Sequence, residues 1–354
     1  MKDESLIKDL TEGNVAKELI VYSLPFMGAS ILQVLYNLVD LAVVGHFVGS
    51  VGLSAVGIGG HLLMLITSFI IGFSAGGQIY ISQLVGSKNY DKLNKTIGTL
   101  FVLLLGTGVL ITIIGLIVSP HLIGILHTPE AAVSQTGDYM LICCGGVLFI
   151  CGYNVVSAIL RGMGESRLPM VFALVATAVN VVLDLVFVGA MGMQSAGAAL
   201  ATIIGQGVSF LISIVYLYIH RKSFGFDFKL SSFIPNRVVM GRIVRLGLPI
   251  GIQQIFIQVS MMFVNSRVNA CSLTASAVDA VGAKLNGIMG VITASMQSAS
   301  SAMIGQNIAA GKKDRVRKIF WTNEAVCTGF LVVIAILCLG FPTQVFSLFN
   351  SEEE

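Results

Sequence analysis

The sequence predicts an all-α integral membrane protein. Hydrophobic residues make up 55% of the 354 residues, charged residues only 11%, and the mean hydropathy is +0.88. A soluble domain typically carries about a quarter charged residues. The apolar residues fall in long runs of at least the roughly 20 residues that a spanning helix needs. Helices are the expected form because a spanning segment must satisfy its backbone hydrogen bonds internally.

Nine apolar runs are separated by polar segments, and each is expected to be one membrane span. Along the chain they cover residues 16–45, 52–84, 96–119, 137–160, 168–191, 195–220, 244–268, 276–306 and 318–346. The first run follows a polar N-terminal stretch. Basic residues then gather in every second connection, with Lys88, Lys92 and Lys95, Arg161 and Arg167, the 221–245 cluster, and Lys312 to Lys318. By the positive-inside rule the N-terminus is cytoplasmic, in a multi-pass protein of the cell (inner or plasma) membrane.

The chain also repeats itself. LPF at 24–26 recurs as LPI at 248–250, and QLVGSKNYDKL at 83–93 recurs as QNIAAGKKDRV at 306–316. Six spans separate the two copies, so they share one orientation and form a parallel repeat about an axis normal to the membrane. The sequence therefore predicts three regions: an N-terminal six-helix lobe (1–220), a cytoplasmic lobe linker (221–243) and a partial C-terminal lobe of three helices (244–354).

Two carboxylates lie inside predicted spans, Asp40 in the first and Asp184 in the fifth. Ionisable groups in hydrocarbon are costly and mark functional sites by default. At ~1.5 Å rise per residue, Asp40, Asp184 and Thr202 all lie roughly 8 to 11 Å from the outer ends of their helices, so they can meet. Asn180 lies on the same face as Asp184, one turn away. This set suits a hard cation or a proton shared between carboxylates. The alternative is a neutral, hydrogen-bonded Asp pair that only holds helices together.

Other residues of the first two spans suggest a cavity, a bend and a close helix contact. Gln33, Tyr36 and Asn37 lie on roughly the same helical face as Asp40, and we expect them to line a substrate cavity. Pro25 removes a backbone hydrogen bond inside the first span, which permits either a hinge or a static kink. Gly72 and Gly76, four residues apart in the second span, favour close approach of another helix.

Several segments resemble the multidrug and toxic compound extrusion (MATE) transporters: LPFMGASILQVLYNLVDLAVVGHFVG, GQIYISQLVGSKNYDKL, RGMGESRLPM and NVVLDLVFVGAMGMQSAGAALATIIGQ. The resemblance extends over the whole chain. It implies a two-lobe MATE-like helical bundle around a central cavity, with the first lobe complete and the second lacking its last three helices.

The resemblance also implies roles for individual residues. The family positions that match Asp40, Asn180, Asp184 and Thr202 bind the coupling ion, and these four residues would be the metal ligands if the ion is Na⁺. Asn154 and Ser157 join the substrate cavity by resemblance, although either could equally make an interhelical hydrogen bond. Family members are thought to bend the first helix when its Asp is protonated, which makes Pro25 the expected hinge.

We therefore expect a cation-coupled antiporter that exports organic, often cationic, drugs or toxic compounds by alternating access. Na⁺ or H⁺ would be the coupling ion, with no other cofactor. The expected partners are a small organic substrate and membrane lipid, with no nucleic acid, and the expected state is a monomer. No phosphate-binding G-x-x-x-x-G-K-[ST] motif or catalytic pairing is present, so we expect neither ATP use nor enzymatic activity. The alternatives are a lipid-linked oligosaccharide flippase of related architecture, or a non-transporting membrane fragment or scaffold.

Overall fold

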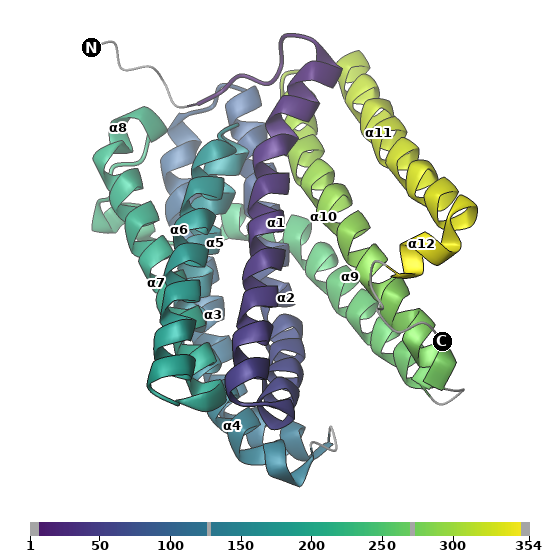
Figure 1. The fold of residues 1–354 in the computed structure, drawn as a ribbon. Coiled ribbons are helices and arrows are strands. Elements are labelled where there is room, and N and C mark those ends of the chain that lie inside the picture. Colours follow the sequence, from purple (N-terminus) through teal and green to yellow (C-terminus); the bar gives the residue numbers. More distant parts are fainter. Residues whose placement is uncertain (1–6, 126–128, 270–272, 348–354) are drawn as a thin grey trace.

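The computed structural model describes residues 7–125, 129–269 and 273–347. The described chain is built from helices that run back and forth between two ends (Figure 1). The long helices are α1 (Val15–Phe47), α2 (Ser50–Gly86), α3 (Asp91–Ile125), α4 (Glu130–Gly145), α5 (Val147–Gly162), α6 (Arg167–Asp184), α7 (Gln194–Ile219), α9 (Arg237–Asn269), α10 (Leu273–Ala309) and α11 (Lys313–Gly340). Short helices complete the order: the π-helix η1 (Leu185–Ala190), α8 (Arg221–Phe224), the 3₁₀-helix η2 (Leu230–Phe233) and α12 (Pro342–Ser347).

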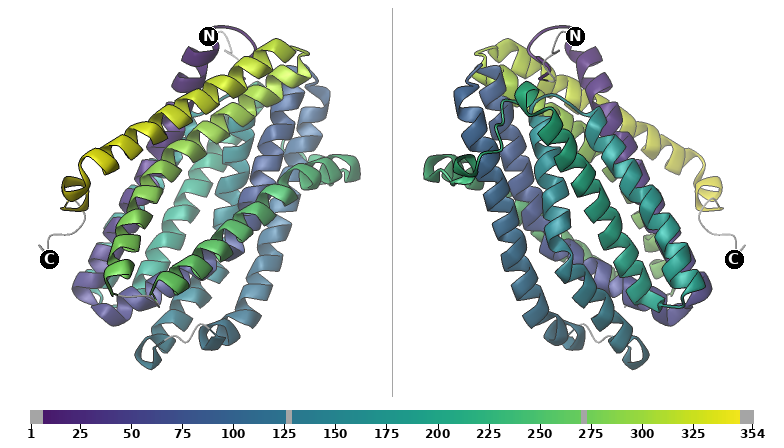
Figure 2. Two further views of the ribbon diagram at one scale, coloured as in Figure 1. Left: turned by 90° about the vertical axis from the view of Figure 1, so that its right-hand side faces the viewer. Right: turned by 90° about the vertical axis from the view of Figure 1, so that its left-hand side faces the viewer.

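Helices α1 to α7 form one bundle, and α9 to α11 lie along one side of it. The starts of α1, α3, α6 and α11 share one end of the molecule, which we call the strap end because residues 8–13 cross it (Figure 1). The other end is called the distal end. Helix α9 crosses α2 obliquely, and α11 lies outermost, beside α10 (Figure 2). The main core lies inside the first bundle and is built chiefly from α2, α3 and α5.

The membrane-spanning helices follow the sequence prediction with two differences, one in α10 and one at α4 and α5. Among the described residues, seven helices are long and apolar enough to cross a membrane, or eight if the bent pair α4–α5 counts as one span. The eighth predicted span, 276–306, falls within α10, which is not among them. This helix is long, but it carries a polar stripe of Ser and Gln residues toward the strap end, so its composition is less apolar.

The predicted fourth span, 137–160, is broken rather than continuous. Helices α4 and α5 meet at Gly146 with a bend of 45°. A side-chain Cβ at Gly146 would come within 2.3 Å of Ile203 on α7, so the chain needs glycine where the two helices join against α7. The contact comes from a helix about sixty residues away in the chain, which local sequence patterns do not reveal.

The internal repeat is visible in the helices themselves. Helices α1 and α9 are each 33 residues long and each contains an internal proline, Pro25 or Pro249. Helices α2 and α10 are each 37 residues long. The first two helices of the bundle therefore have counterparts of equal length in α9 and α10, whereas α3 has 35 residues and α11 has 28.

Glycines let α2 and α9 join the two groups of helices at close range. A Cβ added at Gly72 or Gly76 of α2 would come within 2.6 Å or 2.5 Å of backbone atoms of α9, at Gly247 and Gly251 or at Ile243. The close approach predicted for Gly72 and Gly76 is present, and its partner is another pair of glycines four residues apart. Backbone-to-backbone contact of this kind is how membrane helices pack through small residues.

The connection predicted as the lobe linker, 221–243, is folded against α3. Phe226 and Phe233 pack on Phe101 of α3, with ring centroids 6.2 Å and 5.9 Å away. The Asn94 amide of α3 donates a hydrogen bond to Ser232 at 3.2 Å. Helix α9 begins at Arg237 and not at residue 244, so the last part of the predicted linker is already helical.

Candidate functional site

The two intramembrane carboxylates come from different helices and meet near the distal end. Asp40 lies two turns before the end of α1, and Asp184 is the last residue of α6, where the chain passes into the π-helix η1. Asp40 is 6% exposed and Asp184 is 0% exposed. The two side chains are near enough to interact electrostatically. Single π-helical turns inside α-helices are often found at functional sites.

Asn180 and Thr202 lie beside this pair. The Asn180 amide donates a hydrogen bond to the Thr202 hydroxyl at 3.4 Å, and both residues are buried. The contact depends on Gly205 of α7, where a Cβ would come within 2.8 Å of the Ala176 carbonyl oxygen and 3.3 Å of the Asn180 Cβ. The small residue therefore lets α6 and α7 approach closely enough for the amide to reach the hydroxyl.

Tyr36, one turn before Asp40 on α1, joins the same group. Its hydroxyl interacts with Thr202 and with both carboxylates. The structure thus brings together the four residues that the sequence analysis assigned to ion coupling and adds Tyr36, which had been assigned to the substrate cavity. We call this set the carboxylate cluster; it consists of Tyr36, Asp40, Asn180, Asp184 and Thr202.

The chemistry of the carboxylate cluster fits a hard cation or a proton. Asp40 Oδ1 is buried and accepts no hydrogen bond from any side or main chain in the described residues. A buried acceptor left in that state costs free energy, which a proton or a cation at that oxygen would recover. Carboxylate, amide and hydroxyl oxygens are hard ligands. Over the described residues, no group of three or more His, Cys, Asp and Glu side chains is arranged to hold a metal ion, as a transition-metal centre would require.

A small cavity of about 30 Å³ adjoins the cluster between α1, α5, α6 and α7. That volume is enough for roughly two water molecules and too small for a drug-sized compound. The lining residues are Ala29, Gln33, Tyr36, Tyr153, Ala173, Ala176, Thr177, Asn180, Thr202 and Gln206. The cavity therefore shares three residues with the carboxylate cluster.

The residues predicted to line a substrate cavity divide into two groups. Gln33 and Tyr36 line the cavity. Asn37 is exposed on α1 and is not among the lining residues. Asn154 donates a hydrogen bond to the Ile150 carbonyl oxygen within α5 at 2.8 Å, and Ser157 is buried further along α5; neither lines the cavity. The interhelical alternative considered for these two residues is not seen for the Asn154 amide, whose bond stays within its own helix.

Several residues that surround the site were not predicted from the sequence. Thr177 and Gln206 line the cavity, and each lies one turn from a predicted site residue, Asn180 or Thr202, so helical spacing could have identified them. Tyr139 of α4 is buried and interacts electrostatically with Asp40. Its position depends on the break at Gly146, which gave no readable signal.

Pro25 lies inside α1 but far from the cluster. The helix is continuous from Val15 to Phe47, and Pro25 precedes Asp40 by fifteen residues, which is about 22 Å along the axis. Any bend at Pro25 would therefore act on the cluster through the length of α1, as a lever, and not through direct contact.

Comparison with known proteins agrees with this architecture. The MatE family profile matches residues 25–186 and 249–354, so each matched segment begins at one of the two repeated prolines. The chain belongs to the MatE family. Its members are transporters and not enzymes, which confirms the resemblance to MATE transporters found in the sequence. The two matched segments correspond to α1 through the start of η1 and to α9 onward.

Relatives of this MatE chain are similar along nearly its whole length. The probable multidrug resistance protein YpnP of Bacillus subtilis is 31% identical over 98% of this chain and 77% of its own length. A transporter of the MOP superfamily from Pyrococcus furiosus has a similar structure, with a TM-score of 0.89 and 26% identity over 99% of this chain and 77% of that one. An outward-facing multidrug resistance MATE family transporter gives a TM-score of 0.89 and 25% identity with the same coverage. The chain is thus a multi-pass membrane protein of a family associated with multidrug efflux.

Proposed function

We propose that this chain is a cation-coupled antiporter in which Na⁺ or H⁺ binds at the carboxylate cluster and drives export of small organic molecules by alternating access. The observation that carries the proposal is the meeting of two buried carboxylates, Asp40 and Asp184, from two different helices. Structural carboxylates alone would be an expensive way to join two membrane helices.

The coupling follows from electrostatics. Two buried carboxylates that are both ionised repel each other strongly, because the low dielectric around them screens little charge. A bound proton or Na⁺ removes that repulsion and occupies Asp40 Oδ1. Occupied and empty forms therefore favour different separations of α1 from α6 and η1, and an ion gradient can shift the population between two conformations. Pro25 supplies the position in α1 where such a shift can be accommodated.

The cavity indicates the class of substrate. Its lining combines amide, hydroxyl and aromatic groups with alanines, and among the described residues it includes no Lys or Arg. This surface suits neutral or cationic amphipathic molecules and argues against an anionic lipid-linked oligosaccharide. The cavity must widen to admit a drug-sized molecule, which alternating access would provide. We place the protein in the plasma (inner) membrane as a monomer with a cytoplasmic N-terminus, and we propose no ATP dependence.

The decisive experiment replaces Asp40 by Asn, which keeps the shape of the side chain and removes its ability to exchange a proton or pair with Na⁺. Proteoliposomes containing the variant are expected to lose at least about tenfold in gradient-driven ethidium efflux, since most of the differential ion binding is gone. Asp138→Asn is the matched control, because Asp138 is an exposed carboxylate of α4 outside the cluster. Equal thermal stability of both variants would exclude misfolding.

Separate arms identify the ion and test the alternatives. Efflux is measured with a pH gradient in Na⁺-free buffer, and with a Na⁺ gradient at clamped pH. Full efflux by Asp40→Asn under both gradients would refute the coupling role. Absence of efflux by the unsubstituted chain under both gradients would instead favour the non-transporting scaffold.

A further inference from the structure

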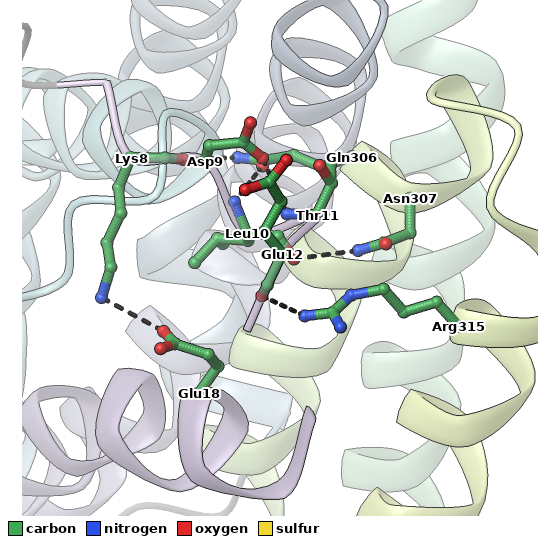
Figure 3. A network of polar contacts seen from close by, with 9 residues as sticks. All are labelled: Lys8, Asp9, Leu10, Thr11, Glu12, Glu18, Gln306, Asn307 and Arg315. Atoms are coloured by element: carbon green, nitrogen blue, oxygen red, sulfur yellow. Dashed lines mark hydrogen bonds and ion pairs between the residues drawn. The ribbon is translucent and has the colours of Figure 1, made fainter. Parts of the chain in front are cut away.

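Residues 8–13 form an extended strap across the strap end before α1 begins. Figure 3 shows the strap lying between the first bundle and the turn that joins α10 to α11. Leu10 is fully buried, packed in a cluster with Leu19 and Tyr22 of α1, Met303 of α10 and Ile319 of α11. The strap is therefore held by apolar packing as well as by polar contacts.

Two buried amides of α10 bind the strap backbone. The Leu10 amide N–H donates to Gln306 Oε1 at 2.8 Å, and Gln306 Nε2 donates to the Lys8 carbonyl oxygen at 3.2 Å. Asn307 Nδ2 donates to the Leu10 carbonyl oxygen at 3.1 Å. Both Gln306 and Asn307 are 0% exposed. One glutamine thus satisfies a donor and an acceptor of the strap, as a neighbouring β-strand would.

Two cations at the start of α11, Lys312 and Arg315, continue the same pattern, and Figure 3 shows Arg315 beside the strap. Lys312 Nζ donates to the carbonyl oxygen and the hydroxyl of Thr11 at 2.9 Å and 3.0 Å. The Arg315 guanidinium donates to the carbonyl oxygens of Glu12 and Gly13, the latter at 2.6 Å. Hydrogen bonds from charged donors are stronger than those between neutral groups. The α10–α11 turn therefore recognises the main chain of the strap along its length.

The other edge of the strap is tied to the first bundle. The Lys8 amide N–H donates to the Met163 carbonyl oxygen, in the turn between α5 and α6, at 2.9 Å. A Cβ at the next residue, Gly164, would come within 2.7 Å of the Lys8 carbonyl oxygen, and Gly164 has a φ of +88°. The strap consequently bridges two turns that belong to different groups of helices.

We propose that residues 8–13 are a detachable clasp that holds the α5–α6 turn and the α10–α11 turn together, and that the strap end opens only when the α10–α11 side releases the clasp. This inference rests on the alternating access proposed above. The strap continues directly into α1, the helix that carries Asp40, so movement of α1 and release of the clasp are mechanically linked. Recognition through main-chain atoms makes the clasp reversible without any covalent change.

Hydrogen exchange of the full 354-residue chain tests the clasp without requiring transport. The variants are Gln306→Ala and, because loss of a buried amide could unfold the turn, the more exposed pair Lys312→Ala with Arg315→Ala. Each removes donors to the strap backbone. Gln253→Ala on α9 is the matched control, since Gln253 is exposed and lies outside the strap contacts. Exchange is followed in segment 7–14 and in residues 78–86 of α2, which have no hydrogen bond to the strap.

A clasp predicts exchange about tenfold faster in segment 7–14 of both variants, and also faster exchange in residues 78–86, because the whole strap end opens more often. The Gln253→Ala control should match the unsubstituted chain in both segments. Faster exchange confined to segment 7–14 would overturn the proposal, because the strap would then bind to the strap end without holding the two turns together. Unchanged exchange in both variants would overturn it as well. Asp40→Asn leaves every strap contact in place, so failure of ion coupling and failure of the clasp are distinguishable.

Discussion

At the scale of single residues, the surroundings of the Asp40 carboxylate bear most directly on the proposed function. Its carboxylate is buried among helices, and one oxygen receives no hydrogen bond within the described residues. In the antiporter proposed above, a proton or cation at this oxygen would recover the free energy lost by leaving it unpaired. That free energy would couple ion binding to conformation.

In contrast to Asp40, the Asp9 carboxylate accepts hydrogen bonds and lies near cationic side chains. Burial raises the pKa of the Asp9 carboxyl, but hydrogen bonds from the Thr11 amide and hydroxyl and the charges of Lys312 and Lys88 outweigh burial and hold the pKa below its ordinary value of 3.8. The Thr11 N–H reaches Asp9 Oδ1 at 2.8 Å. The ionised form of Asp9 thus stabilises the backbone conformation in the middle of the strap.

A pH dependence of the strap follows. Because the pKa of Asp9 is lower in the folded protein than in the unfolded chain, its contribution is fully present above the unfolded value and is lost as the pH falls through the folded value. Protection of segment 7–14 against hydrogen exchange, corrected for intrinsic rates, is expected to stay constant from neutral pH to about pH 5 and to decline below about pH 4. Asp9→Asn should remove this decline. A decline of equal size in Asp9→Asn would assign the effect to another group.

At the scale of the element, helix packing in this protein depends on the positions of glycines. Helix α2 contacts α9 backbone to backbone at Gly72 and Gly76, and α7 contacts α6 at Gly205 beside Asn180. Without a hydrophobic driving force between helices in lipid, such close van der Waals contact is a principal source of association. Glycine positions therefore decide which helix faces meet, and hence which polar residues share a site.

Paired Gly→Ala substitutions test this view. Gly76→Ala places a Cβ within 2.5 Å of the Ile243 carbonyl oxygen, whereas Gly106→Ala on α3 meets no atom within 4 Å. Gly76→Ala is expected to destabilise the protein by about 1 to 3 kcal/mol through overpacking. Gly106→Ala should be neutral or stabilising by up to about 1 kcal/mol, because alanine favours the helix. Unfolding in mixed detergent measures both, and equal effects of the two changes would contradict the packing account.

Two irregular elements also position the site. The break at Gly146 turns α4 away from α5 and brings Tyr139 toward Asp40, and the π-helix η1 begins directly after Asp184. A π-helical turn widens the helix and rotates the residues beyond it relative to those before it. Asp184 therefore lies at the change in helical geometry between α6 and η1.

Across the whole molecule, polar contacts join the two groups of helices toward the strap end. Besides the strap, the buried Gln78 of α2 donates to the Ser298 carbonyl oxygen at 2.8 Å and to the Ser301 hydroxyl at 3.1 Å, both on α10. A Cβ at Gly305 of α10 would come within 1.9 Å of the Ser82 hydroxyl of α2. These contacts between α2 and α10, which we call the polar seal, lie on the same side of the molecule as the clasp. The carboxylate cluster lies toward the distal end.

Removal of the polar seal should weaken the join between α2 and α10. Gln78→Leu has a similar volume but removes the two hydrogen bonds to half-buried partners on α10, so we expect a loss of about 1 to 3 kcal/mol in the free energy of unfolding. Gln253→Leu, an exposed position on α9, should change stability by less than about 0.5 kcal/mol. Denaturation of the two variants in the same detergent provides the comparison, and a stable Gln78→Leu protein would show that the seal is not held by these bonds.

Much of this architecture could be predicted from the sequence. The apolar runs predicted the helices, the recurrence of LP and of the basic turns predicted the repeat, and equal depths predicted that Asp40, Asp184 and Thr202 could meet. These features are local: they depend on composition, on helical periodicity and on the fixed rise per residue. The sequence also identified Gly72 and Gly76 as a contact face, though not the helix that they contact.

Other features were decided only by the tertiary structure. The break at Gly146 depends on Ile203 of α7, and the strap is fixed by Gln306 and Asn307, almost three hundred residues away. The lining of the cavity likewise depends on which faces of α1, α5, α6 and α7 turn toward one another. The physical reason is that a side chain's helix and its depth follow from its neighbours in the chain, whereas its partners follow from how closely whole helices can pack.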